Sequence, residues 1–592
     1  MAEPSPRFLW LLSLLAVASC AAYAAGVLSG ASLTDVLALD SIAAEHEHWH
    51  IRAVTATELR GLKIALALVA TGLGLTAALL VRIPTGRHEW TALGIESRAV
   101  WAATARRWQR LPTRARLGAG LGLVVLTALR TYFSLSKPLH AEEIASYEFF
   151  VSKGLLAVST YYPIPNNHIL SNALSWAFYR LNPGFWWSMR LPVLLISTAG
   201  TTGWFLGLLR WTNFRVAVWA TAGFCWLQLS LYNASAGRGY WLLISLVGIL
   251  FFCTLALNQP GENKRAAWAG LLLAGLAGCY TVPTFAYALG SALAWLGWHS
   301  LRQRDWPQLG RIVGVGVAIG AGCLALYAPM LLVSGSGRLF GNGFVAARDA
   351  HVFWPGLPAY LWFTEGMLAG QRTVGGALVL AVIGGAGYWL GWLPGRPAAV
   401  DSVPTRAVSG QYQLGKAALW FALFPYALVL AQRVFPPERV LLYKSFFLFI
   451  LIGLLADAWL RRPVPTWQRR WSRRLLLAVF AVFAAYQTHY VEFLNQQGRA
   501  TVAAYHDGFT WLQQQPVGPV LAPEPLHNLY FRFYAHTTSP ARPWQLDILL
   551  RPTRRYAYVV AFPNKRGAFQ PQFSFPPAYA NAQVEIFVLP QQ

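Results

Sequence analysis

The chain has 592 residues, of which 56% are apolar and 12% are charged, and its mean hydropathy is +0.40. Soluble proteins carry about 25% charged residues, so this composition excludes a soluble globular domain, and it excludes disordered, fibrous and disulfide-scaffold classes as well. The five cysteines lie inside apolar runs without CxxC spacing, which is typical of small buried side chains rather than of a disulfide framework or a zinc site.

Apolar runs long enough to cross a bilayer recur from end to end of the sequence. We therefore predict a polytopic α-helical membrane protein with about thirteen transmembrane helices. The predicted spans are 8–30, 61–81, 117–136, 191–209, 216–233, 240–258, 266–283, 284–300, 312–333, 373–393, 417–432, 441–460 and 475–489.

The distribution of basic residues predicts the orientation of these spans. With the N-terminus in the cytoplasm, the inner segments carry 25 Lys and Arg over 103 residues, whereas the outer segments carry 13 over 141. This asymmetry follows the positive-inside rule. The net charge of +25 is thus explained by contact with anionic membrane lipid, not by a nucleic-acid partner. Arg outnumbers Lys 41 to 7, one indication of a GC-rich bacterial genome, and we expect a multi-pass protein of the bacterial inner (plasma) membrane.

Residues 490–592 differ from the rest in having mixed polarity and short strand-like runs. They predict a small α/β domain on the periplasmic or outer side. Residues 1–116 hold two spans that precede the main bundle, so the expected parts are 1–116, a core over 117–489, and 490–592. The expected elements of the last part are strands at 517–521, 544–550, 556–562 and 584–589 and helices at 502–514 and 524–536.

Ionisable residues gather in the predicted outer loops, chiefly in 137–190. Glu142 and Glu143 lie in a short helix expected over 140–153, and a second short helix is expected over 168–181. Burying an ionisable group in a membrane protein is costly, so such groups are candidates for a functional role. A carboxylate can act as a general base, although adjacent carboxylates in a loop are commonly just solvated.

Three cations, Arg238, Arg439 and Lys444, fall at the same predicted membrane level as the acidic pair. Guanidinium and ammonium groups are the side chains that bind phosphate, so these three are candidates for holding a phosphate; an Arg at the outer end of a span is also commonly an interfacial anchor. Four further residues of this face are candidate substrate contacts: Tyr162, Asn167, His168 and Tyr240. Alone, the Pro165–His168 run is more typical of a turn before a helix.

The order of these motifs is familiar: an outer acidic loop, Tyr-Pro-x-Pro-Asn-Asn-His at 162–168, Met-Arg-Leu-Pro at 189–192, Ala-Gly-Arg-Gly-Tyr at 236–240 and Pro-Glu-Arg at 437–439. It resembles the GT-C superfamily of integral-membrane glycosyltransferases over about residues 117–460. The closest resemblance is to family 39, which includes protein O-mannosyltransferases and the aminoarabinose transferases of lipid A.

The resemblance implies a membrane enzyme that moves a sugar from a polyprenyl-phosphate donor to a glycan, lipid or protein acceptor, with inversion. It implies Glu142 as the base and Glu143 as a group that orients the acceptor or a metal ion, and it implies donor-phosphate contacts for Arg238 and Arg439. A divalent metal ion is a conceivable cofactor, with Glu143 and His168 as weak candidate ligands. No cofactor is firmly expected.

Three other features leave alternatives open. The run Glu45–His50 could form a zinc or copper site, lie over the acidic loop or be a solvated loop. The outer loop 334–372 begins with a glycine-rich segment and is either a cover for the site or a linker. Val17–Cys20 resembles a lipoprotein signal, although an ordinary signal-anchor helix is the favoured interpretation. The rival functions are a transporter or flippase of lipid-linked glycans, which needs polar groups through the bilayer centre, and a non-catalytic glycan-binding scaffold.

Overall fold

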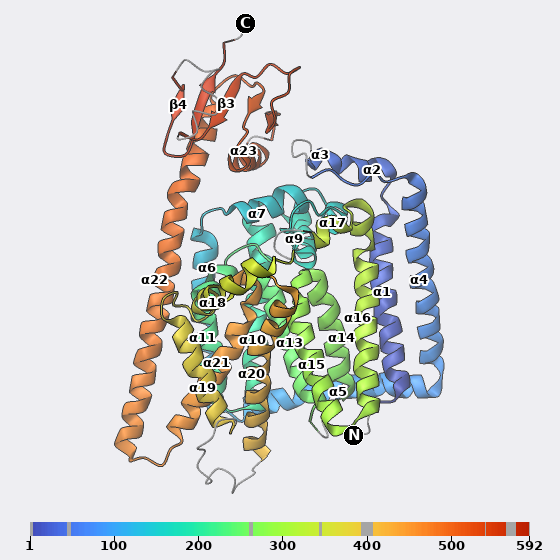
Figure 1. The fold of residues 1–592 in the computed structure, drawn as a ribbon, viewed down its shortest axis with the longest axis vertical. Helices are drawn as coiled ribbons and strands as arrows, with labels where there is room; N and C mark the ends of the chain where they lie inside the picture. Colours follow the sequence, from blue (N-terminus) through green and yellow to red (C-terminus); the bar gives the residue numbers. More distant parts are fainter. Residues whose placement is uncertain are drawn as a thin grey trace.

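The computed structural model describes residues 4–43, 49–259, 264–341, 346–391, 406–538, 540–563 and 576–590. A bundle of upright helices carries short surface helices on one end, and a small sheet domain stands above them (Figure 1). We call this end the outer face, following the orientation predicted from the sequence. The chain begins at the opposite, inner end and finishes in the sheet domain.

Among the described residues, nine helices are long and apolar enough to cross a membrane. A tenth crossing is formed if α11 (Phe214–Trp226) and α12 (Gln228–Ala234), which meet at 70°, are counted as one bent span. The nine are α1 (Pro6–Ser29), α4 (Ala56–Arg82), α6 (Thr113–Ser136), η2 with α10 (Trp186–Trp211), α13 (Tyr240–Leu257), α16 (Trp306–Val333), Gly410–Gln432 of α20 (Arg406–Gln432), α21 (Tyr443–Leu460) and α22 (Thr466–Gln513).

The three other predicted spans are also helices, although they do not meet that test of length and hydropathy. They are α14 (Lys264–Thr281), α15 (Ala286–Gln303) and α19 (Gly375–Trp389). Each of the thirteen apolar runs thus corresponds to a helix or to the bent pair. The protein is an integral membrane protein of the predicted polytopic helical class.

The helices differ in how much they are enclosed by others. In α21, 72% of the most apolar window is buried, and in α13 61%, whereas in α4 and α22 the share is 11%. A helix that is hydrophobic all round belongs either inside a bundle or in lipid. The first two are therefore the centre of the bundle, and α4 and α22 form its edges, as Figure 1 shows.

Helix α5 (Pro84–Gln109) was not expected, because residues 82–116 were read only as a basic inner segment. It lies across the inner ends of the upright helices (Figure 1). Its buried Glu89 and Glu96 bind Arg265 at the start of α14, with N–O distances of 2.5 and 2.9 Å. These ion pairs, not an apolar run, fix α5 to the bundle.

The outer face holds the two short helices that the sequence predicted. The first is α7 (Ala141–Ser146) continued by a π-helical turn, η1 (Tyr147–Val151), and the second is α9 (Ile169–Leu181). Between them is α8 (Leu155–Thr160), and η2 (Trp186–Arg190) is a second π-helical turn at the start of α10. The loop 334–372 contributes α17 (Ser336–Phe340) and α18 (Ala350–Leu368), so most of its described part is helical.

Towards the C-terminus, α22 runs without a break for 48 residues. It joins the predicted last span to the predicted helix 502–514, and it passes through the expected domain boundary at 489/490. The sheet has the order β2-β1-β3-β5-β4, with β1 parallel to β2 and β3 and the other pairs antiparallel. Its strands are β1 (Val520–Leu521), β2 (Leu546–Asp547), β3 (Tyr558–Ala561), β4 (Tyr579–Ala580) and β5 (Glu585–Val588).

Four of the five strands fall within the predicted runs, and only β4 was missed. The predicted helix 524–536 is α23 (Pro525–Thr538). This helix rests on the outer loop: the Tyr530 hydroxyl donates to the Leu139 carbonyl at 2.9 Å, and the rings of Tyr147 and Phe533 meet edge to face. The C-terminal domain therefore covers the loop that carries the acidic pair.

One ion pair in this contact depends on pH. His536 of α23 binds the buried Glu148 of η1, with Nδ1 3.0 Å from Oε1. The hydrogen bond with Glu148 raises the pKa of His536 above its ordinary value of 6.5, against the effect of burial. Because the folded-state pKa is the higher one, the stabilisation is fully present below pH 6.5 and is lost as pH rises through the folded-state value.

We expect α23 to open more often from the outer loop at pH 8 than at pH 6. Hydrogen exchange of the α23 amides, corrected for the intrinsic pH dependence of exchange, measures this opening. Glu148→Gln should abolish the difference between the two pH values, whereas His489→Gln, on the exposed side of α22, should leave it intact. Equal protection at both pH values in the native chain would contradict the role of this pair.

Candidate functional site

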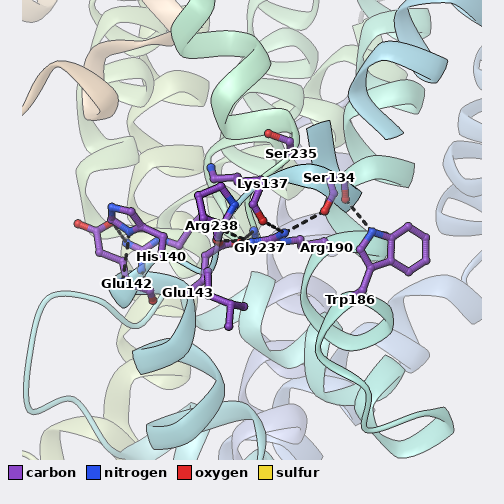
Figure 2. Close-up of polar contacts among 12 residues, drawn as sticks. Ser134, Lys137, His140, Glu142, Glu143, Trp186, Arg190, Ser235, Gly237 and Arg238 are labelled. Carbon is purple, nitrogen blue, oxygen red and sulfur yellow. Dashed lines mark hydrogen bonds and ion pairs between the residues drawn. The ribbon is translucent and has the colours of Figure 1, made fainter. Parts of the chain in front are cut away.

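The acidic pair lies in the first turn of α7, on the outer face of the bundle. The ring of His140 caps this helix, accepting the backbone N–H of Glu142 at Nδ1 over 3.3 Å. Carboxylates are favoured at a helix N-terminus by the helix dipole. The two adjacent carboxylates nevertheless have separate surroundings, with Glu143 pointing inward to Arg190 and Glu142 lying on the other side near His140 (Figure 2).

Glu143 is fully enclosed and bound from two sides. The Nε and Nη2 groups of Arg190 donate to its two oxygens over 3.1 and 2.9 Å, and the backbone N–H of Gly237 donates to Oε1 over 2.5 Å. Burial would raise the pKa of Glu143, but Arg190 and Lys137 outweigh burial and lower that pKa to about 2. This carboxylate is therefore a permanent anion whose oxygens are already occupied.

Arg190 ties Glu143 to the end of α6. Its guanidinium also donates to the carbonyls of Ser134, Lys137 and Pro138, over 2.9 to 3.1 Å. The sequence analysis placed this arginine in a motif but gave it no role. Its last position in the π-turn η2 is what aims it at Glu143, and π-turns are frequent at functional sites.

Two glycines bring the loop 235–239 close to these groups. A Cβ at Gly237 would lie 2.8 Å from the Cβ of Met189, and a Cβ at Gly239 would lie 2.9 Å from the ring of His168. The backbone N–H groups of the two glycines donate to Glu143 and His168. The Gly-Arg-Gly pattern around Arg238 thus has a physical reason, since only glycine permits this close approach.

Glu142, in contrast, faces solvent and two cations. Its side chain is 31% exposed, Oε2 lies 3.3 Å from Nη2 of Arg238, and Oε1 lies 3.1 Å from Nη2 of Arg439. Burial would raise the pKa of Glu142, but Arg238 and then Arg439 outweigh it and hold that pKa below its usual range. The expected grouping of Glu142 with these two arginines is present in the structure.

Arg238 is buried and held in place by several groups. Its Nη1 donates to the carbonyl of Glu142 at 3.1 Å, to the Ser146 hydroxyl at 3.3 Å and, in a very short contact, to the side-chain oxygen of Asn166. Asn166 itself donates to the Glu142 carbonyl over 2.9 Å.

The sequence predicted Asn167 as the substrate contact. In the structure Asn167 faces the loop interior and bonds the carbonyls of Val158 and Tyr161, so Asn166 is the asparagine at the site.

His168 stands beside Arg238 in an unusual arrangement. Its Nδ1 accepts the Gly239 N–H over 2.9 Å, so a neutral ring carries its proton on Nε2. Burial, with Arg238 and Arg439 next in effect, lowers the pKa of His168 well below 6.5 and keeps the ring neutral. Nε2 is 3.3 Å from Nη2 of Arg238, so two N–H donors face each other.

The two candidate tyrosines differ in their contacts. Tyr240 begins α13, meets the ring of His168 edge to face at 4.8 Å and interacts with Arg439, whose guanidinium it helps to keep charged. Tyr162 is buried, and its backbone N–H donates to the hydroxyl of Ser334 over 2.8 Å. Burial raises the pKa of Tyr162 to about 12. Both residues line the surroundings of the two arginines rather than the acidic pair directly.

Lys444 does not join this group. Its Nζ binds Glu365 of α18 at 2.5 Å and lies 3.5 Å above the ring of Tyr426, and these three residues line an apolar cavity of about 270 Å³ between α18, α19, α20 and α21. Position along the chain placed Lys444 with Arg439, but Lys444 is the second residue of α21 and its side chain binds Glu365 instead. Its charge is balanced by an acid that the sequence analysis did not connect with it.

The candidate metal ligands do not form a metal site in the described part of the chain, where no three His, Cys, Asp or Glu side chains converge suitably. Both oxygens of Glu143 are bound to Arg190, and Nδ1 of His168 accepts a backbone N–H. Within the His-rich run, positions 45–48 lie outside the described residues. His50 pairs with Asp40 over 3.0 Å.

Searches by sequence find no matching protein-family model and no matching curated protein. Solved structures do match. The apo structure of ArnT from Cupriavidus metallidurans has a TM-score of 0.52 and 16% identity, covering 80% of this chain and 98% of its own. The structure of the same protein bound to undecaprenyl phosphate has a TM-score of 0.52 and 17% identity, covering 79% and 97%. This chain therefore shares the fold of ArnT over most of its length, and the polytopic helical fold expected from the sequence is confirmed.

The two neighbouring glutamates should respond differently to amide substitution. Glu143→Gln leaves the buried Arg190 without its counter-ion, which costs about 3–5 kcal/mol of stability, and we expect a clear fall in Tm in nanodiscs. Glu142→Gln removes a carboxylate that is 31% exposed and bound less completely, so we expect a smaller fall in Tm. Equal shifts of Tm in the two variants would contradict the structural assignment of Glu143.

Proposed function

We propose that the protein is a GT-C glycosyltransferase that moves a sugar from a polyprenyl-phosphate donor to an acceptor on the outer face of the bacterial inner membrane. The observation that carries this proposal is the position of Glu142, a partly exposed carboxylate held between Arg238 and Arg439. ArnT, whose fold this chain shares, has been solved with undecaprenyl phosphate bound, which supports a polyprenyl-linked donor.

The proposed reaction is a single in-line displacement. The acceptor nucleophile attacks C1 of the sugar while the bond between C1 and the phosphate oxygen breaks, and the nucleophile's proton passes to Glu142. The electron pair of the broken bond leaves with the polyprenyl phosphate. Arg238 and Arg439 stabilise the charge that develops on this phosphate, a role for which preorganised donors in a partly buried site are effective.

The crowded donors around His168 support a phosphate subsite at Arg238. Two N–H donors that face each other, Nε2–H of His168 and Nη2 of Arg238, repel unless an acceptor atom lies within reach of both. The Nε group of Arg238 is buried without a partner among the described residues. A phosphate oxygen can accept hydrogen bonds from both donors, and because it is charged it binds them more strongly than a neutral acceptor does.

Binding of the donor then prepares the base. In the free protein both oxygens of Glu142 are engaged with the arginines that the phosphate requires. When a phosphate takes these arginines, Glu142 loses the charges that hold its pKa low, and its affinity for the nucleophile's proton rises. The arrangement favours donor binding before proton transfer.

The decisive experiment follows release of polyprenyl phosphate by purified protein in nanodiscs, with a panel of labelled polyprenyl-phosphate sugars and membrane extract as acceptor. Glu142→Gln should lower turnover by about 10²- to 10⁴-fold while donor binding is retained. Arg439→Gln should weaken donor binding by about 10- to 100-fold. Glu438→Gln is the matched control for Glu142→Gln, since it makes the same substitution at the residue before Arg439. It should have little effect on turnover or on donor binding.

Each rival function has its own signature in this experiment. Donor binding without turnover, together with movement of labelled lipid across the bilayer, would indicate a flippase. Donor or glycan binding with neither turnover nor movement would indicate a non-catalytic scaffold. Turnover that survives Glu142→Gln would remove this residue as the base.

A further inference from the structure

A second cavity lies outside the site described above, where the C-terminal domain meets the outer loop. It has a volume of about 510 Å³, which is within the range of ligand pockets. One side of its wall is Glu148 of η1 and Lys153, two residues after η1. The other side is built from α23, the segment between α23 and β2, β2 itself and the segment after β2. No residue of a membrane-spanning segment is part of this wall, so the cavity has no place for a polyprenyl chain.

The lining of this cavity is strongly cationic. Five cations, Lys153, Arg532, Arg542, Arg551 and Arg554, stand against two acids, Glu148 and Asp547. So many like charges around one cavity raise the local concentration of anions. The cations come from both the outer loop and the C-terminal domain, so the charge is a property of the assembled contact.

Both acids are already engaged. Glu148 is buried and binds His536 at 3.0 Å. Asp547 is buried and accepts hydrogen bonds from Arg554 and from the hydroxyl of Tyr556, both at 2.7 Å. It also forms an ion pair with Arg551 at 3.6 Å. The positive charge of Lys153 and Arg532 is not balanced by these acids, and Lys153 and Arg542 are exposed, so the cavity opens to the outer solvent.

The cavity is close to the proposed base. Glu148 in its wall is six residues after Glu142 on the continuous segment α7–η1. At about 1.5 Å per helical residue, the two side chains are rooted roughly 9 Å apart along the helix. The cavity therefore lies within about two helical turns of Glu142 along this segment.

We propose that this cavity binds an anionic group of the acceptor, a phosphate or a carboxylate carried on a saccharide, and so positions the acceptor nucleophile near Glu142. The assignment to the acceptor rests on the proposed transferase function. The donor phosphate already has its place at Arg238 and Arg439, whereas the cavity is formed by polar, solvent-accessible groups of the covering domain.

The test measures binding of three saccharide probes to the full chain in phosphatidylcholine nanodiscs at low salt: glucose 6-phosphate, trigalacturonate and the neutral maltotriose. At least one anionic probe should bind and protect the α23 amides from hydrogen exchange, and maltotriose should not. The double variant Lys153→Gln/Arg532→Gln should weaken anion binding by about tenfold or more. Arg555→Gln, which removes one cation of the same domain outside the cavity, should leave binding unchanged.

Binding of the three probes identifies the anionic group that the cavity prefers, and together with the variants it can contradict the proposal. Binding of glucose 6-phosphate alone indicates a phosphate-bearing acceptor, and binding of trigalacturonate alone indicates a carboxylate-bearing one. The proposal is wrong if maltotriose binds equally well, if the double variant retains full affinity, or if Arg555→Gln loses as much. The conservative variant Arg532→Lys should keep most of the affinity, which separates loss of charge from loss of folding.

The binding measurement needs neither donor nor turnover. A failure of the proposed transferase activity therefore leaves its result intact. Conversely, polyprenyl phosphate binding measured in the same nanodiscs should be unaffected by the double variant, because the donor contacts lie at Arg238 and Arg439. The two proposals can thus fail separately.

Discussion

The arrangement of the outer face depends on one buried ion pair, Glu143 with Arg190. The pair joins the start of α7, the end of η2 and the loop that begins at Gly237, three segments far apart in the sequence. Breaking a buried pair is costly because it leaves an uncompensated charge. The neighbours of these anchored residues, Glu142 before Glu143 and Arg238 after Gly237, are thereby brought together. One carboxylate of the acidic pair holds the structure, and the other stays partly exposed, as the proposed base requires.

Much of the fold could be predicted because its signals are local. Continuous apolar runs identified the spans, and short alternating runs identified four of the five strands. The errors concern features that a hydropathy profile does not record. Helix α5 is held by Arg265, which is about 170 residues away, and α22 continues through the membrane surface because nothing in its sequence breaks the helix. Neither fact is visible in the hydropathy of the segment itself.

In the candidate site, too, some features could be predicted from the sequence and others could not. The chain order of motifs correctly grouped Glu142, Arg238 and Arg439, but it could not distinguish Asn166 from Asn167. Adjacent residues on a turn point in different directions. Asn166 is the one that contacts Arg238, and the position of Arg238 depends in turn on the Glu143–Arg190 ion pair. Lys444 is a similar case. Its distance along the chain from Arg439 is small, yet one turn of helix directs it to Glu365 in another cavity.

The balance of charge at the site supports an anionic ligand. Around Glu142 and Glu143 lie Arg190, Arg238, Arg439 and Lys137, the last of which burial brings to a pKa of about 7. The site thus carries a surplus of between one and two positive charges near neutral pH. Uncompensated charge in a partly buried site is unfavourable, and a phosphate monoester brings about 1.5 to 2 negative charges. In the proposed reaction, release of polyprenyl phosphate creates that charge beside these cations, so the charge balance of the site is consistent with the proposal.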